Sequence, residues 1–206
     1  MYARTTTIQG TSAAIDDATA YMRDEVMPAV QQMDGFVGLS VLADRDSGRC
    51  IIATAWQTEE AMRATMDRVG PMRDRVAELL GGRPEVQTWE IAVLHRVREA
   101  PAGAWVRVTW PRIDPPRLDQ LLDTYRIGVL PRLEEMDGFC SASMLVDRTE
   151  GAAAGTVTFK DRASLERTRD AAAAIRERTS QEIGVNFVDV AEFELVLAHL
   201  RVPETV

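Results

Sequence analysis

The sequence predicts an α+β protein in which one βαββαβ unit occurs twice. Residues 27–56 and 130–159 align without a gap and share 10 of 30 residues, among them a Met-Asp-Gly-Phe segment that begins at Met33 in the first copy. A second match, at a spacing of 104, relates residues 89–95 to residues 193–199. Because the period is about half of the 206 residues, each copy is a complete small domain and not a short stacking element.

The first copy is expected to read strand, helix, strand, strand, helix, strand. Apolar residues return every three or four positions across residues 13–33, which is typical of an amphipathic helix. Pro28 lies inside this pattern and Pro131 inside its repeat, so a kink or a division of the helix is expected in both copies. The strands of the first copy are predicted at residues 3–9, 36–43, 50–56 and 86–95.

The second helix of each copy begins after a good capping residue, Thr58 in the first copy and Asp161 in the second. In the first copy, Gly70 and Pro71 are expected to interrupt this helix. The second copy has no proline there, and its helix, residues 164–182, is expected to be more continuous than that of the first copy.

The element order βαββαβ is that of the ferredoxin-like split motif, in which both helices cover one face of a four-stranded sheet. The last strand of each copy carries apolar residues on both faces, so the face without helices also needs a cover. The sheet of the other copy is the simplest cover. The predicted domains are residues 1–97 and 105–202, with residues 98–104 as a linker.

Composition excludes several classes of function. A formal charge of −8, from 32 acidic and 24 basic residues, argues against a nucleic-acid surface, which needs clustered Lys and Arg. No segment approaches the length of a membrane span, and the N-terminal residues do not read as a signal peptide. Cys50 and Cys140 form no metal-binding or redox motif. A cytoplasmic protein without contact to membranes is therefore expected.

Three segments carry a family resemblance. These are Asp34-Gly35-Phe36, the Asp44-Arg45 hairpin loop, and residues 55–62, where a strand ends in an aromatic residue and a helix opens with acidic residues. With the duplication, they resemble antibiotic biosynthesis monooxygenase (ABM) domains, bacterial members of the dimeric α+β barrel superfamily. The resemblance covers both halves and implies tandem ferredoxin-like domains that form an intramolecular pseudo-dimeric α+β barrel.

The resemblance implies a cofactor-independent monooxygenase without a metal, acting on an aromatic or polyketide-like molecule held between sheet and helices. In many relatives a histidine lies on the second helix, and here that position is Thr65, with Thr168 as its repeat. Haem-degrading relatives use an asparagine on the first strand, and neither first strand has one. The alternatives left open are a non-catalytic protein that binds a small apolar or aromatic ligand and a partner-docking protein, with a further homodimer possible for each.

Histidines are the first candidates for catalysis. His95 and His199 are the only two in the chain and end the last strands of the two copies. Each could serve as a base or anchor at the barrel rim. The favoured interpretation is a half-exposed residue at a strand end, kept by the duplication.

Aromatic and arginine residues are the candidates for ligand binding. Trp56 and Trp110 could line an aromatic pocket or belong to the core, and Tyr21 and Tyr125 could project a phenol from the first helices. Methionines on the helices would suit an adaptable pocket. The small residues 152–155 could leave space along the third strand of the second copy.

Arg4 and Arg107 occupy equivalent positions on the first strands. They could hydrogen-bond a ligand carbonyl or carboxylate. A salt bridge to Glu90 and Glu194, respectively, on a neighbouring strand is the favoured interpretation.

Overall fold

The computed structural model describes residues 1–200, which divide into two compact units. Unit 1 consists of residues 1–90 and 194–200, and unit 2 consists of residues 91–193. The last strand of each copy crosses this division: residues 84–96 begin in unit 1 and end in unit 2, and residues 186–200 begin in unit 2 and end in unit 1. The eight strands are hydrogen-bonded in the order β1-β3-β2-β8-β5-β7-β6-β4 and close into a barrel, so the predicted tandem α+β barrel is confirmed. The domain limits predicted from the repeat, residues 1–97 and 105–202, remain a prediction.

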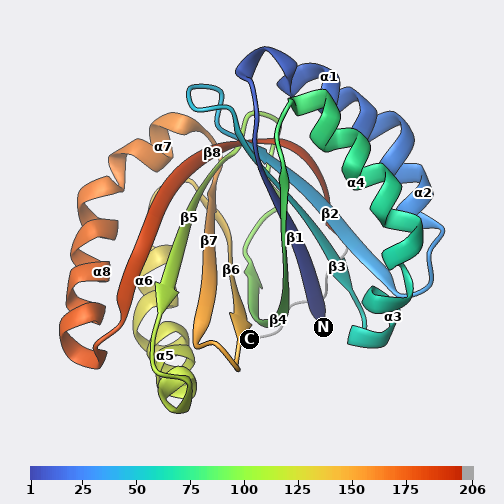
Figure 1. The fold of residues 1–206 in the computed structure, drawn as a ribbon. Coiled ribbons are helices and arrows are strands. Elements are labelled where there is room, and N and C mark those ends of the chain that lie inside the picture. The colour runs from blue at the N-terminus through green and yellow to red at the C-terminus, as the bar shows by residue number, and fades with distance from the viewer. Residues whose placement is uncertain (201–206) are drawn as a thin grey trace. The chain divides into compact units, whose positions relative to one another are not determined.

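Unit 1 has a ferredoxin-like arrangement of strands and helices (Figure 1). Its elements in chain order are β1 (Tyr2–Gln9), η1 (Ser12–Ala14), α1 (Ile15–Tyr21), η2 (Met22–Val26), α2 (Met27–Gln31), β2 (Phe36–Ala43), β3 (Arg49–Trp56), α3 (Glu59–Ala64), α4 (Met66–Leu80) and β4 (Pro84–Arg96). Strand β1 pairs antiparallel with β3 on one side and with the first part of β4 on the other. Strand β2 pairs antiparallel with β3 and with the last part of β8.

Unit 2 repeats this order with closely matching element lengths. Its elements are β5 (Trp105–Arg112), η3 (Pro115–Arg117), α5 (Leu118–Thr124), η4 (Tyr125–Val129), α6 (Leu130–Glu134), β6 (Phe139–Asp147), β7 (Ala152–Phe159), α7 (Arg162–Arg167), α8 (Arg169–Ile183) and β8 (Asn186–Leu200). Strand β7 pairs antiparallel with β5 and with β6.

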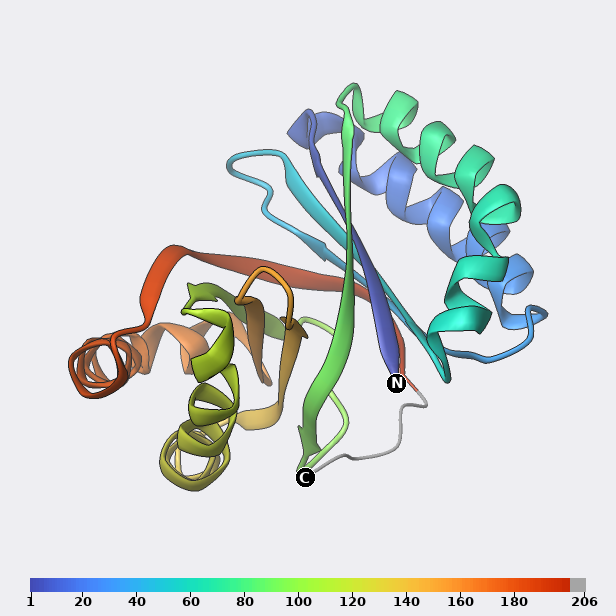
Figure 2. The same ribbon diagram turned by 60° about the horizontal axis from the view of Figure 1, so that its bottom comes forward.

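In each unit the helices form a layer on one face of the strands. Figure 2 shows the long helices of unit 1, blue and green, lying side by side along one face of their strands, and α1 contacts α4. Buried apolar side chains fill the space between the two layers, with Ile8, Leu39 and Trp56 fully buried in unit 1. None of the helices within residues 1–200 is long and apolar enough to cross a membrane.

The expected interruption of the first helix takes the form of a π-helical turn. The turn spans Met22–Val26 in unit 1 and Tyr125–Val129 in unit 2, and in both units it ends just before the proline. Proline has no N–H to give to the preceding turn. The wider turn lets the helix continue past it, and π turns of this kind often lie next to functional sites.

The predicted break at Gly70 and Pro71 is wrong, and so is the greater continuity predicted for the second helix in copy two. Pro71 lies inside α4, and both second helices divide earlier, at Thr65 and Thr168. At each break the threonine hydroxyl donates to a helix carbonyl, Met62 O at 2.8 Å in unit 1. The position of the break is therefore set by side-chain contacts and not by proline.

The predicted caps are correct at both second helices. The Thr58 hydroxyl accepts a hydrogen bond from the N–H of Ala61 at 3.1 Å, and the Asp161 carboxylate accepts one from Ser164 N–H at 2.7 Å. These bonds satisfy N–H groups that have no partner within the helix.

Candidate functional site

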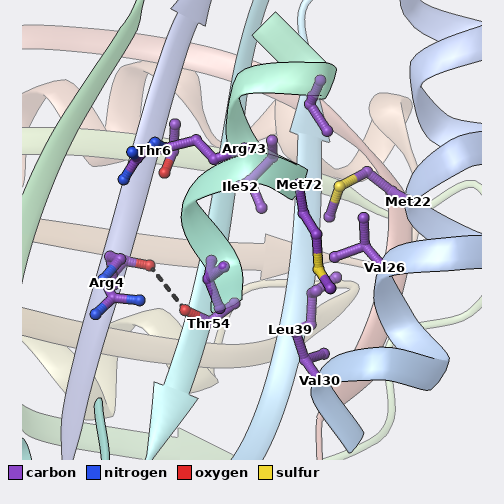
Figure 3. A pocket seen from close by; sticks show the side chains of 12 residues that line it. Arg4, Thr6, Met22, Val26, Val30, Leu39, Ile52, Thr54, Met72 and Arg73 are labelled. Carbon is purple, nitrogen blue, oxygen red and sulfur yellow. Dashed lines mark hydrogen bonds between the residues drawn. The ribbon is translucent and has the colours of Figure 1, made fainter. Parts of the chain in front are cut away.

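Unit 1 contains a small cavity between its strands and its helices (Figure 3). The polar lining residues are Arg4, Thr6, Thr54 and Arg73, and the apolar ones include Met22, Leu39, Ile52 and Met72. The volume of about 30 Å³ suits a water molecule or a carboxylate-sized group. A drug-sized ligand needs about 300 Å³ or more, so an aromatic ligand would have to displace side chains.

Two methionines lie where that displacement would occur. Met22 from η2 and Met72 from α4 both reach into the space over the strands (Figure 3). Methionine is unbranched and has three rotatable bonds, so it changes rotamer at little cost. The cavity can therefore enlarge by side-chain motion without a change in the backbone.

Arg4 is the most deeply buried charged group at this cavity, with 4% of its surface exposed. Its Nη1 donates to Thr65 Oγ1 at 3.3 Å, and its Nη2 donates to the backbone oxygen of Met62 at 2.6 Å. Burial, together with the nearby charge of Arg73, lowers the pKa of Arg4 below its ordinary value. Within residues 1–200, Arg4 forms no ion pair with a carboxylate.

Thr65, at the position where the family resemblance implies a histidine, is buried and holds both Arg4 and the break between α3 and α4. The missing histidine is visible in the sequence, but no local pattern predicts this contact. The signal available in the sequence was that Arg4 and Thr65 return together as Arg107 and Thr168 at the spacing of the repeat.

Arg107 reproduces these contacts in unit 2 and adds a carboxylate. Its Nη1 donates to Thr168 Oγ1 at 3.0 Å and its Nη2 to the backbone oxygen of Leu165 at 3.0 Å. Glu192 Oε1 accepts from Arg107 Nε at 3.1 Å and from Nη2 at 2.9 Å. The guanidinium of unit 2 is thus fully engaged by groups of the protein.

Glu192 is held between two guanidinium groups. Burial by itself would raise the pKa of Glu192, but hydrogen bonds from Arg169 and Arg107 outweigh it and hold the pKa below its ordinary value. Arg169 lies at the start of α8 and donates to Glu192 Oε2 from Nε at 3.1 Å. The carboxylate is therefore ionised in the folded protein at neutral pH.

The predicted partners of the two strand arginines are wrong. Arg107 pairs with Glu192 and not with Glu194, which belongs to unit 1 and pairs with Arg45 at 2.7 Å. Arg4 contacts the end of α3 and not Glu90. Residues two positions apart on a strand share a face, so alternation could not distinguish Glu192 from Glu194.

Each histidine packs on an aromatic ring. His199 lies at 6.4 Å from Phe36 between ring centroids, and its Nε2 is 3.1 Å from Gln31 Nε2. His95 lies at 6.4 Å from Phe139. Neither histidine lines the cavity.

The environments of the two histidines differ in charge. His95 Nε2 is 2.9 Å from a carboxylate oxygen of Glu134, at the position that Gln31 holds in unit 1. The two groups are close but not aligned for a hydrogen bond, and neither ring nitrogen of His95 has such a bond within the described residues.

His199 nevertheless lies near the cavity. On β8 it is the register partner of Leu39, which lines the cavity from β2. Directly opposed residues of an antiparallel pair point to the same face of the sheet. The His199 ring is therefore on the cavity side of the sheet, one strand beyond the lining.

The two predicted tryptophans have different environments. Trp56 is fully buried in the core of unit 1, and its indole N–H donates to Thr54 Oγ1 at 3.1 Å. Thr54 lines the cavity, and Trp56 lies beside it on the same face of β3, so Trp56 holds a lining residue without lining the cavity itself. Trp110 is half-buried on β5.

The two predicted tyrosines are not structural equivalents. Tyr21 is half-buried and packs against the core of unit 1. Tyr125 begins η4, as Met22 begins η2, so its equivalent is the cavity residue Met22. Tyr125 is buried, its hydroxyl has no hydrogen-bond partner within residues 1–200, and burial raises its pKa above the ordinary value.

Sequence comparison places the chain with mycobacterial proteins. It is 51% identical over 206 residues to the uncharacterized protein Rv2557 of Mycobacterium tuberculosis, covering 100% of this chain and 92% of that protein. It is 49% identical over 207 residues to the uncharacterized protein Rv2558, covering 100% and 88%. The chain belongs to the family of these two proteins. No protein-family profile matches it.

Solved structures identify the fold of this family. A candidate monooxygenase from Fusobacterium nucleatum superimposes with a TM-score of 0.72 at 10% identity, covering 97% of this chain and 94% of that one. An anthrone oxidase-like protein gives 0.65 at 13% identity, covering 97% and 93%. A ferredoxin-fold protein of Listeria monocytogenes related to antibiotic biosynthesis monooxygenases gives 0.57 at 10% identity, covering 95% and 94%. At these identities the similarity shows a shared fold, and it agrees with the predicted α+β barrel.

Among the residues that the structure describes, no group of three or more His, Cys, Asp or Glu side chains is placed to hold a metal ion. The polar groups that converge at the cavity are two guanidinium groups and two hydroxyls, and guanidinium groups are not metal ligands.

Proposed function

We propose that the protein is a cofactor-independent monooxygenase whose substrate, a small aromatic or polyketide-like molecule, binds in the cavity of unit 1. The observation that carries the proposal is the buried Arg4 guanidinium, which faces this cavity between sheet and helices without a carboxylate partner in the described chain. The structural neighbours that are called candidate monooxygenases and anthrone oxidase-like support the reaction class.

The chemistry requires the substrate as an anion. An electron-rich phenolate or enolate can pass an electron to O2, whereas the neutral phenol is a poor donor. When a ring CH2 becomes a ketone, one oxygen atom of O2 enters the product, the other leaves as water, and the two hydrogens of the CH2 go to that water. This balance needs no external reductant.

Arg4 and Arg73 are suited to stabilise such an anion. A guanidinium is always protonated and so cannot act as the base, but it stabilises negative charge that develops beside it. The stabilisation is larger in a site from which water is excluded. Arg4 is prepositioned for this role by its bonds to Thr65 and to Met62 O.

His199 is our proposed proton acceptor. It lies on the cavity side of the sheet beside Leu39, and a neutral imidazole is the usual general base near neutral pH. His95 has the corresponding position in unit 2, where we propose no substrate site, so it serves as the comparison for His199. Trp56 serves the site by holding Thr54, and Tyr21 packs against the same core.

Oxygen uptake tests the proposal. Purified protein is screened against anthrones, quinols and flavonoids by thermal shift, and oxygen consumption is followed for every stabilising compound. We expect uptake with at least one anthrone or quinol, and a His199→Ala variant that lowers kcat about 10²-fold at nearly unchanged KM, with His95→Ala as the matched control. Stabilisation without uptake would contradict the proposal and would favour a non-catalytic binding protein.

A further inference from the structure

The cavity of unit 1 contains two positive charges and no compensating carboxylate among its lining residues. Arg4 and Arg73 both line it, and the other lining residues are threonines and apolar side chains. Arg73 has one carboxylate neighbour, Asp74, at 3.4 Å, but Asp74 is 64% exposed and is not part of the lining. A buried cation without a counter-ion is unfavourable, so the cavity would gain from an anion.

In unit 2 a side chain of the protein supplies the anion beside the equivalent arginine. Arg107 and Arg176 are the repeat equivalents of Arg4 and Arg73 at a spacing of 103. There the Glu192 carboxylate contacts Arg107 through two N–H groups at 2.9 Å and 3.1 Å. Both bonds end on Glu192 Oε1, and charge-assisted hydrogen bonds of this kind are stronger than those between neutral groups.

The first copy has a threonine in place of that carboxylate. At the spacing of 104 that relates the last strands, Glu192 corresponds to Thr88. Thr88 is the register partner of Arg4 across β1 and β4, so its side chain is on the same face of the sheet as Arg4. A threonine hydroxyl is too short to span the gap that a glutamate spans, and Thr88 is exposed.

Unit 2 also differs from unit 1 at two other positions equivalent to residues that line the cavity. Met22 of the cavity corresponds to the larger Tyr125, which is buried. Ile52 corresponds to Gly155, and the space so created is occupied by Met144, whose Cε lies 3.3 Å from where a Cβ would be. The space predicted along the third strand of copy two is thus filled from the neighbouring strand.

We propose that the Arg4–Arg73 cavity of unit 1 binds the anionic oxygen group, carboxylate or phenolate, of a small apolar ligand, and that Glu192 takes this place in unit 2. Each chain would then have one such site. The apolar part of the ligand would displace Met22 and Met72, while the small polar end of the cavity accepts the anion. The assignment of a substrate anion rests on the proposed function, but anion binding itself requires no catalysis.

The test uses benzoate as the anionic probe and benzamide as its neutral analogue of the same shape. Binding to the full chain is followed by ¹H–¹⁵N NMR, which reports where the probe lies. We expect benzoate to shift the amide signals of Arg4, Met62 and Thr65 and to leave those of Arg107, Leu165 and Thr168 unchanged. Benzamide should bind at least about tenfold more weakly, because it lacks the charge.

Matched variants assign the binding to the arginine pair. Arg73→Met should weaken benzoate binding at least about tenfold, Arg73→Lys should weaken it less, and Arg176→Met should leave it unchanged. Thr88→Glu copies the carboxylate of unit 2 into unit 1 and should abolish binding. Glu192→Thr is the reciprocal change, and new shifts at Arg107 and Thr168 would support the proposal further. A melting curve for each variant confirms that it is folded.

Two results would overturn the inference. One is equal affinity for benzoate and benzamide, and the other is benzoate binding that survives both Arg73→Met and Thr88→Glu. These outcomes are distinct from failure of the proposed function. If benzoate binds as described but no phenolic anion consumes oxygen, the anion site stands and the monooxygenase proposal fails. If oxygen uptake is found but does not depend on Arg73, the anion site fails.

Discussion

Units 1 and 2 share one arrangement of arginine, threonine and helix carbonyl. They differ in whether a carboxylate of the protein pairs with the charge of the arginine. Both arginines bond to the threonine at the helix break and to a carbonyl in the preceding turn. Only in unit 2 does a carboxylate, Glu192, complete the cluster. The difference teaches that the shared contacts hold the second helix in place, while the absence of the carboxylate in unit 1 leaves a charge available to a ligand.

The largest expected effect compares the two arginines directly. Arg107→Met removes one partner of a buried ion pair and leaves Glu192 with Arg169 alone, so we expect a loss of about 3 kcal/mol in the free energy of unfolding, the lower end of the range for a broken buried pair. Arg4→Met removes two hydrogen bonds but also an uncompensated buried charge, and we expect a loss of at most about 2 kcal/mol. Denaturant unfolding, with hydrogen exchange to separate the units, measures both. Equal losses would show that Glu192 does not distinguish the units.

The second prediction is that the stabilisation by Glu192 is lost at low pH. The pKa of Glu192 is lower in the folded protein than in the unfolded chain, so its stabilisation is present above the unfolded value of about 4.3 and disappears as pH falls through the folded value. Glu192→Gln should therefore destabilise unit 2 by about 2 kcal/mol at pH 7, and the deficit should vanish in strong acid.

Unfolding of wild type and variant from pH 7 to pH 2 checks this. Thr88→Gln is the matched control in unit 1 and should show no such convergence. A Glu192→Gln deficit that stays constant with pH would mean that the carboxylate is not ionised in the folded state.

The smallest expected effect is at Tyr125, which replaces Met22 of the cavity. Its buried hydroxyl has no partner in the described chain, so Tyr125→Phe removes an unpaired polar group and should change stability by less than about 1 kcal/mol, in the stabilising direction. Burial raises the Tyr125 pKa, so the wild type should also lose stability as pH rises above about 10, and the variant should lose less. Marked destabilisation of Tyr125→Phe would reveal a hydrogen bond that the hydroxyl makes.

Most of the fold follows from local patterns in the sequence. The repeat and the helical spacing predicted the tandem barrel, and Thr58 and Asp161 were predicted as helix caps. The break at Thr65 was not predictable from local pattern, because it depends on Arg4, 61 residues away in sequence. Pro71 was the stronger local signal and was misleading, since α4 tolerates the loss of one hydrogen bond.

The site was less predictable than the fold. Arg4 and the methionines were candidates, but Arg73 was not, because a helix arginine reads as an exposed residue until the packing of α4 on the sheet is known. Glu192 was missed because the alternation of a strand leaves two acids on one face, and only the register decides between them. The roles of His95 and His199 remain predictions.

The stoichiometry of anion binding tests the central claim most directly. Isothermal titration of the wild-type chain with benzoate should give one site per chain, and Thr88→Glu should give none. Two equivalent sites in the wild type would show that Glu192 does not occupy the place of a ligand in unit 2. No binding at all would show that the Arg4–Arg73 cavity is a structural feature without a ligand.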